Sequence, residues 1–260
     1  MSASSGKIVA MAETIVLLHG FGGTHRTWDR VLARLGAERY RPLALDLRGH
    51  GAARDRRPIT FDACAGDVLA AAPEERFVLC GYSMGGRIAQ HVALAAGERV
   101  SRLVLVATTA GIADPAERAA RRAADAALAE RIERGSIEDF AATWRDQPLF
   151  AGDPPEVARG ARADYLRNDP RALAAVLRGV GTGAMEPLWE RLERLRAPAV
   201  VLAGERDAKF RALGERLAAA LPDARLEIVP GAGHAVHLEA PEAVAEALTG
   251  VRAGPAPSAR

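Results

Sequence analysis

The pentapeptide Gly81-Tyr-Ser-Met-Gly85 constrains the fold of this chain more than any other feature. It follows a short apolar run, Arg76–Cys80, and opens a segment with a helical pattern, Met84–Ala96. A serine in this pattern between a strand and a helix is typical of a nucleophile elbow, a strained turn that exposes the hydroxyl. The flanking glycines leave room for the neighbouring strand and helix. The motif therefore predicts a strand–turn–helix unit with a reactive Ser83.

Two further residues follow Ser83 in the chain order expected of a serine triad, which is Ser, then Asp or Glu, then His. Asp207 follows the apolar run that begins at Val200, and His234 lies in a glycine-rich turn beyond Arg225–Val229. A hydroxyl needs an imidazole to take its proton and a carboxylate to fix the imidazole tautomer. Taken alone, Asp207 could be a helix cap and His234 a turn residue. Their order and their positions after strands predict a catalytic triad of Ser83, Asp207 and His234.

An early apolar strand runs into the glycine-rich segment His19-Gly-Phe-Gly-Gly23. Proteins with a serine elbow build an oxyanion hole from the N–H after the nucleophile and an N–H of an early loop. The backbone N–H groups of Met84 and Phe21 are the candidates here. A plain glycine turn is the alternative interpretation of the loop. For His19 itself we expect a buried role that orients the loop.

The composition is that of a globular protein and gives no support for a nucleic-acid-binding or membrane protein. The 260 residues suffice for one large domain, and 49% hydrophobic and 26% charged residues are ordinary for a globular protein. A formal net charge of +2, without a Lys/Arg run, gives no support for a nucleic-acid partner. The apolar stretches reach only strand length, and residues 1–10 lack a signal-peptide core, so we expect a cytoplasmic protein without a membrane partner. Met11 is an alternative start, and the sequence leaves the oligomeric state open.

The cysteines and lysines are few. Cys64 and Cys80 are the only cysteines, and their positions predict neither a disulfide framework nor a metal site. We expect Cys80 to be a small core residue. Only two of the 35 basic residues are lysines, Lys7 and Lys209. Lys209 lies two residues after the predicted triad carboxylate, where it is either a substrate contact or a solvated loop cation.

Apolar runs of strand length alternate with helical segments along most of the chain. This alternation predicts an α/β fold with a mostly parallel sheet and helices on both faces. Ligands bind such sheets at the carboxyl ends of the strands, where Phe21, Ser83, Asp207 and His234 all fall. The expected strands are Thr14–Leu18, Arg41–Leu45, Arg76–Cys80, Arg102–Val106, Ala199–Ala203 and Arg225–Val229.

The alternation breaks between Gly111 and Pro187, where no strand pattern occurs. We expect this segment to be a helical lid over the strand ends. The predicted division is a first core part at residues 1–110, a lid at 111–186, a second core part at 187–250 and a disordered tail at 251–260. The expected lid helices are Pro115–Arg134, Ile137–Trp144, Pro155–Arg167 and Pro170–Gly179.

These motifs together resemble the α/β-hydrolase superfamily, and the likeness spans nearly the whole chain. It is carried by His19–Gly23, Asp46-Leu-Arg-Gly-His-Gly51, the serine pentapeptide and Gly231-Ala-Gly-His234. The resemblance implies an α/β-hydrolase fold with an inserted helical lid.

A narrower resemblance is to the 2-succinyl-6-hydroxy-2,4-cyclohexadiene-1-carboxylate synthase family of menaquinone biosynthesis. In that family the serine removes a proton from the substrate and pyruvate is eliminated, without water, metal or organic cofactor. The segments that carry this resemblance are Gly81–Arg87, Trp144–Phe150, Gly204–Phe210 and Gly233–Glu239.

The narrower resemblance implies a small anionic substrate held by five side chains. The substrate bears several carboxylates, which guanidinium groups bind with two parallel hydrogen bonds. The lid as a whole is not basic, since residues 111–186 hold eleven Arg against thirteen Asp and Glu. The prediction therefore rests on individual positions, which are Tyr82, Arg87, Trp144, Arg167 and Lys209.

Several alternatives stay open. Arg87 could be a surface residue of its helix, and Trp144 could serve lid packing alone. A second arginine expected early in the lid could be Arg118, Arg121 or Arg122. The main functional alternative is a serine esterase or C–C bond hydrolase with the same triad and a mainly apolar pocket. A binding protein that has lost catalysis is disfavoured, because all three triad residue types are present. Convergence of Tyr82, Arg87, Arg167 and Lys209 near Ser83 would favour the synthase.

Overall fold

The computed structural model describes residues 12–250, so the predictions for Met11 and for the 251–260 tail lie outside the described residues. Six strands form one sheet in the order β2-β1-β3-β4-β5-β6, and every neighbouring pair is parallel. All six predicted strands are confirmed to within two residues at either end. Their bounds are β1 (Glu13–Leu18), β2 (Tyr40–Leu45), β3 (Phe77–Tyr82), β4 (Val100–Val106), β5 (Ala199–Gly204) and β6 (Ala224–Val229).

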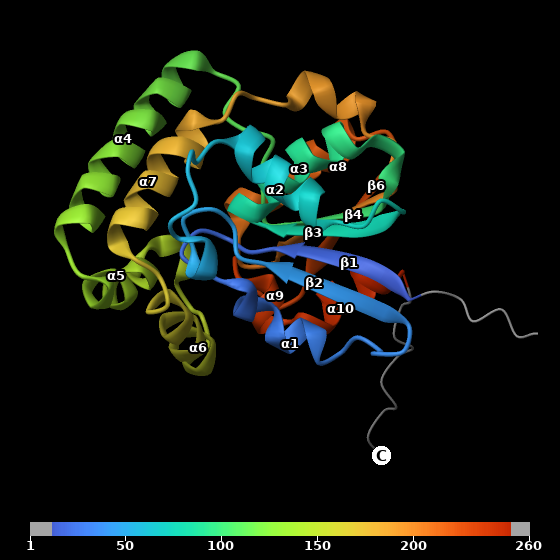
Figure 1. Ribbon diagram of the computed structural model, residues 1–260, viewed down its shortest axis with the longest axis horizontal. Helices are drawn as coiled ribbons and strands as arrows, with labels where there is room; N and C mark the ends of the chain where they lie inside the picture. The colour runs from blue at the N-terminus through green and yellow to red at the C-terminus, as the bar shows by residue number, and fades with distance from the viewer. Residues whose placement is uncertain (1–11, 251–260) are drawn as a thin grey trace, which may run out of the picture.

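Helices cover both faces of the sheet. Helices α2, α3 and α8 lie on one face, and α1, α9 and α10 lie on the other (Figure 1). No helix within residues 12–250 is long and apolar enough to cross a membrane. The helices on the two faces are α1 (Asp29–Leu32), α2 (Phe61–Ala71), α3 (Met84–Ala96), α8 (Ala208–Ala220), α9 (Val236–Glu239) and α10 (Pro241–Thr249).

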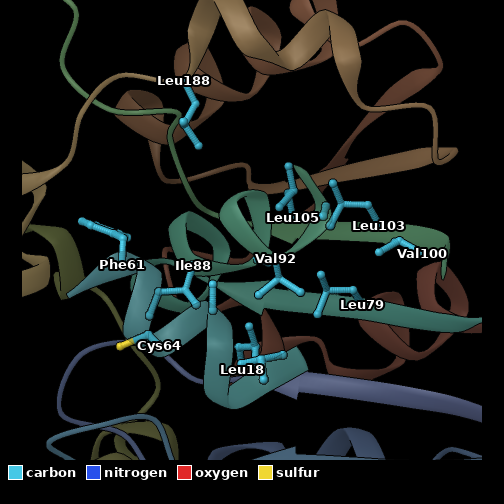
Figure 2. Close-up of a cluster of buried hydrophobic side chains, with 14 of the residues drawn as sticks. Leu18, Phe61, Cys64, Leu79, Ile88, Val92, Val100, Leu103, Leu105 and Leu188 are labelled. Atoms are coloured by element: carbon cyan, nitrogen blue, oxygen red, sulfur yellow. The ribbon is translucent and has the colours of Figure 1, made fainter. Parts of the chain in front are cut away.

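The sheet separates two hydrophobic cores, because successive side chains of a strand point to opposite faces. Leu79 of β3 packs with Ile88 and Val92 of α3 in one cluster, shown in Figure 2. Its strand neighbours Val78 and Cys80 lie in the cluster on the opposite face. The central strands β1, β3, β4 and β5 are mostly buried, and strands covered on both faces are near-continuous apolar runs that the sequence locates well.

Four helices between β4 and β5 form the helical insert, which lies beyond the carboxyl ends of the strands (Figure 1). Local capping fixes their starts: Asp114 caps the first helix, and Ser136 with Asp139 forms a capping box at the second. Trp144, expected in the second helix, instead begins a short 3₁₀ turn at Trp144–Asp146. The four helices are α4 (Pro115–Arg134), α5 (Ile137–Thr143), α6 (Pro155–Tyr165) and α7 (Pro170–Val180).

Candidate active site

Ser83 lies in the turn between β3 and α3 with φ 49° and ψ −107°. A positive φ is strained for a residue other than glycine, and such strain gathers at functional sites. Two hydrogen bonds hold the turn: the Ser83 N–H donates to the Val106 carbonyl at 2.9 Å, and the Thr108 hydroxyl donates to the Ser83 carbonyl at 2.7 Å. The serine hydroxyl thus stands at the carboxyl end of a central strand in the geometry of a nucleophile elbow.

The glycines around Ser83 are dictated by close backbone approach. A Cβ on Gly81 would lie 2.3 Å from the Gly85 carbonyl oxygen, and one on Gly85 would lie 2.2 Å from the Leu18 carbonyl oxygen. A Cβ on Gly86 would lie 2.6 Å from the Thr108 side chain. The spacing of the pentapeptide therefore follows from the packing of α3 against β1 and β3.

We expect Gly85→Ala to lower the free energy of unfolding by about 1–3 kcal/mol, because its methyl group meets backbone that cannot turn away. Gly66→Ala is the matched control, since Gly66 is exposed within α2 and nothing lies within 4 Å of its added Cβ. That control should gain up to about 1 kcal/mol. Urea denaturation of both variants checks the prediction, and equal stabilities would contradict it.

The structure brings the three predicted triad residues together. His234 Nδ1 lies 2.7 Å from Asp207 Oδ2, and His234 Nε2 lies 3.4 Å from Ser83 Oγ. Asp207 and His234 are buried, with exposed fractions of 7% and 1%. If the Nδ1–H donates to the Asp207 carboxylate, the Nε2 lone pair faces the serine hydroxyl. This is the histidine tautomer that can accept the serine proton. The long Ser83–His234 distance is common in sites without a bound substrate.

The loop after β1 lies directly against the serine turn. A Cβ on Gly20 would be 2.7 Å from the Tyr82 ring and 3.6 Å from Ser83 Cβ, so only glycine allows this approach. Met84 begins α3, where the first N–H groups have no acceptor within the helix. The backbone N–H groups of Phe21 and Met84 are thus carried by the two segments that meet at Ser83. Their role as an oxyanion hole remains a prediction.

Two buried histidines shape this loop. His19 Nδ1 donates to the Gly20 carbonyl at 2.8 Å, and its Nε2 accepts the Leu47 N–H at 3.0 Å. His50 Nε2 accepts the Gly22 N–H at 3.2 Å. Desolvation by burial lowers the pKa of both imidazoles, which keeps them neutral as acceptors. His19 therefore orients the loop, as the sequence indicated, and His50 is a second loop-holding residue that the sequence did not single out.

The helical insert also holds the loop after β1. The carboxylate of Asp164 in α6 accepts hydrogen bonds from the Thr24 N–H, at 2.8 Å, and from the Thr24 hydroxyl. Asn168 follows the same helix and donates to the Gly22 carbonyl at 2.6 Å. Both side chains are buried. The insert is thus joined to the loop that carries Phe21.

We expect Asp164→Ala to lower kcat by about 10-fold or more while KM changes less, because the loop donor then loses its alignment. Asp164→Asn is the matched control: its amide oxygen can accept the Thr24 N–H and its NH2 group can donate to the Thr24 hydroxyl. Steady-state kinetics should find Asp164→Asn close to the unsubstituted chain. Full kcat in Asp164→Ala would show that the insert does not position the loop.

A cavity of about 70 Å³ lies between the serine turn, the loop after β1 and the insert. Of the predicted site residues, Ser83, His234, Phe21, Tyr82 and Trp144 line it. The Tyr82 ring lies 5.3 Å from the His234 ring and 4.1 Å from the His237 ring. Burial raises the pKa of Tyr82, so its hydroxyl keeps its proton. The remaining lining residues are Gly20, Gly23, Thr27, Arg145, Leu149, Phe150, Ala161, Asp164, Tyr165, His237 and Leu238.

Three predicted anion-binding residues lie outside the lining of this cavity. Arg87 is buried and donates to the Val180 carbonyl at 2.6 Å, and burial lowers its pKa to about 10. Arg167 is half-exposed and lies 3.7 Å from the Asp164 carboxylate, and Lys209 is exposed. Their contact with a substrate remains a prediction of the sequence alone.

The three arginines that were candidates early in the insert all contact groups outside the cavity. Arg121 pairs with Asp125 at 2.8 Å, and Arg122 donates to the Gly183 carbonyl at 3.1 Å. Arg118 lies 3.6 Å from the Glu186 carboxylate. None of the three lines the cavity around Ser83. The cationic residue that does line it, Arg145, was not predicted, although it adjoins Trp144 in the sequence.

The chain is similar to known α/β hydrolases in both sequence and structure. A family model described as "Alpha/beta hydrolase family" matches residues 15–247. The 2-succinyl-6-hydroxy-2,4-cyclohexadiene-1-carboxylate synthase of Serratia proteamaculans (strain 568) is 37% identical over 239 residues, covering 90% of this chain and 91% of the relative. The solved structure of MenH from S. aureus matches with a TM-score of 0.85 and 31% identity, over 92% of each chain. A thermophilic esterase from Thermogutta terrifontis matches with a TM-score of 0.78 and 27% identity, over 92% of this chain and 89% of the esterase.

Proposed function

We propose that this chain, which belongs to the alpha/beta hydrolase family, is a carbon–oxygen lyase of menaquinone biosynthesis. The reaction eliminates pyruvate from 2-succinyl-5-enolpyruvyl-6-hydroxy-3-cyclohexene-1-carboxylate and forms 2-succinyl-6-hydroxy-2,4-cyclohexadiene-1-carboxylate. The observation that carries the proposal is the 37% identity with a synthase of that name over 90% of this chain. The cytoplasmic location expected from the sequence is part of the proposal.

The proposed mechanism uses Ser83 as a base rather than as a nucleophile. His234, oriented by Asp207, takes the hydroxyl proton through Nε2, and the Ser83 oxygen removes a proton from the substrate ring. The electrons of that C–H bond, at C2, form the C2=C3 double bond, the electrons of the existing C3=C4 double bond shift to C4=C5, and the bond from C5 to the enolpyruvyl oxygen breaks. The departing enolate receives the proton held by His234 and becomes pyruvate, which returns Ser83 and His234 to their starting states. The N–H groups of Phe21 and Met84 would stabilise negative charge that develops on a substrate oxygen.

A serine hydrolase is the second candidate, and one observation favours it. Of the four residues whose convergence would favour the synthase, only Tyr82 lines the cavity, and most of the other lining side chains are apolar or aromatic. The similarity to an esterase at a TM-score of 0.78 points the same way. The same triad would then attack a carbonyl carbon and pass through an acyl-enzyme.

Substrate kinetics separate the two candidates. We expect the purified chain to release pyruvate from the synthase substrate, followed by a coupled lactate dehydrogenase assay, with kcat/KM of about 10⁴–10⁸ M⁻¹ s⁻¹. Hydrolysis of p-nitrophenyl acetate should be far slower. Efficient ester hydrolysis without pyruvate release would overturn the proposal, and inactivity on both substrates would oppose it equally.

A further inference from the structure

Arg145 is the one lysine or arginine among the described residues, 12–250, that line the cavity around Ser83. It lies in the short turn after α5, and its Nη1 donates to the Tyr165 hydroxyl at 3.2 Å. Its guanidinium carbon lies 4.5 Å from the centroid of the Phe150 ring, and that ring lies 5.9 Å from the His234 ring. The Phe150 ring is therefore a neighbour of both Arg145 and His234.

The charge of Arg145 is balanced by an acid from the same insert. Arg145 forms an ion pair with Asp153, and the two side chains are 9% and 4% exposed. The Arg145 Nε is also buried and has no hydrogen-bond partner within the described residues. A buried ion pair contributes little stability relative to apolar residues of the same size, and an unpaired buried donor costs free energy. Such an arrangement is better explained by a ligand than by the folding of the insert.

We propose that Arg145 binds a carboxylate of the substrate, and that Asp153 holds the Arg145 side chain when the cavity is empty. The choice of an anionic ligand rests on the proposed function, whose substrate bears several carboxylates. Arginine suits this task because its planar donors match the two oxygens of a carboxylate. Arg145 would then supply the cation that the cavity lining otherwise lacks.

Arg145 keeps one donor available for such a carboxylate. Its Nε has no hydrogen-bond partner among the described residues, whereas the nearby Arg206 is already paired with Glu239 and donates to the Gly152 carbonyl. The acid that lines the cavity, Asp164, already accepts two hydrogen bonds from Thr24. A carboxylate that enters the cavity therefore meets one cation that still has an unpaired donor.

Two boronic acids test the proposal without synthase turnover. Phenylboronic acid and 3-carboxyphenylboronic acid each form a bond from boron to the serine oxygen while the serine proton passes to the histidine, and only the second carries a carboxylate. Their affinities are measured by calorimetry for the unsubstituted chain, for Asp153→Asn and for the double variant Arg145→Met/Asp153→Asn. The double variant removes both charges together, so that no unpaired buried charge threatens the fold.

We expect Asp153→Asn to bind the carboxylated boronate more tightly, and the double variant to bind it about 10- to 100-fold more weakly than Asp153→Asn does. Phenylboronic acid should bind all three chains alike. Equal losses for both boronates, or no loss for the carboxylated one, would overturn the role of Arg145. If neither boronate binds, the KM for the synthase substrate decides: a rise of about 10- to 100-fold in the double variant supports the proposal, and an unchanged KM refutes it. Failure of the unsubstituted chain to release pyruvate would instead count against the proposed function alone.

Discussion

Replacing Ser83 by alanine is expected to lower kcat for pyruvate release by roughly 10³-fold or more, because groups that act as one unit lose nearly all activity when one is removed. The serine oxygen is the atom that His234 Nε2 faces at 3.4 Å, and a methyl group there can neither give up a proton nor take one. Ser101→Ala is the matched control, since Ser101 lies at the amino end of β4 and its hydroxyl bonds to Glu13. Stopped assays of purified variants with equal thermal stability provide the measurement. Near-normal turnover in Ser83→Ala would remove Ser83 from the mechanism.

The Asp207→Asn variant is expected to lose about 10⁴-fold in kcat through the wrong histidine tautomer. Asp207 Oδ1 accepts the Phe210 N–H at the start of α8, while Oδ2 faces His234 Nδ1 at 2.7 Å. In the variant, the amide oxygen of the new side chain keeps the helix cap, so its NH2 group faces Nδ1. His234 must then carry its proton on Nε2, where it cannot accept one from Ser83.

The fold of this variant should survive, because the cap of α8 is retained. Asp207→Ala serves as the comparison: it loses the cap as well, which costs about 1 kcal/mol of stability, and it should be no more active. The pH dependence of kcat and the unfolding midpoint are measured for both. Activity of Asp207→Asn within 10-fold of the unsubstituted chain would show that the carboxylate does not set the tautomer.

Much of the fold could be predicted from the sequence, because its signals are local. Buried parallel strands are continuous apolar runs, and the insert helices begin at capping residues such as Ser136. The family matches confirm the predicted α/β-hydrolase fold. The meeting of Ser83, Asp207 and His234 follows from parallel strands alone, since their carboxyl ends share one edge of the sheet.

Contacts across the insert could not be predicted in this way. Arg87 is one turn into α3, which suggested a place near the substrate, but the helix directs its guanidinium to the Val180 carbonyl of α7. The bond between Asp164 and Thr24 joins residues 140 positions apart, and no local pattern marks it. The place of Arg145 at the cavity could not be predicted either, because it depends on how the turn after α5 packs against Tyr165.

Turnover of the synthase substrate in water enriched in oxygen-18 tests the central claim most directly. Elimination takes no oxygen from solvent, whereas hydrolysis places a water oxygen in the product. Mass spectrometry of the ring product is compared with finished product incubated without enzyme; pyruvate is not scored, because its keto oxygen exchanges with water. The account predicts pyruvate release with no label in the ring product above that control. Label above the control would contradict elimination by Ser83 and leave the chain a serine hydrolase.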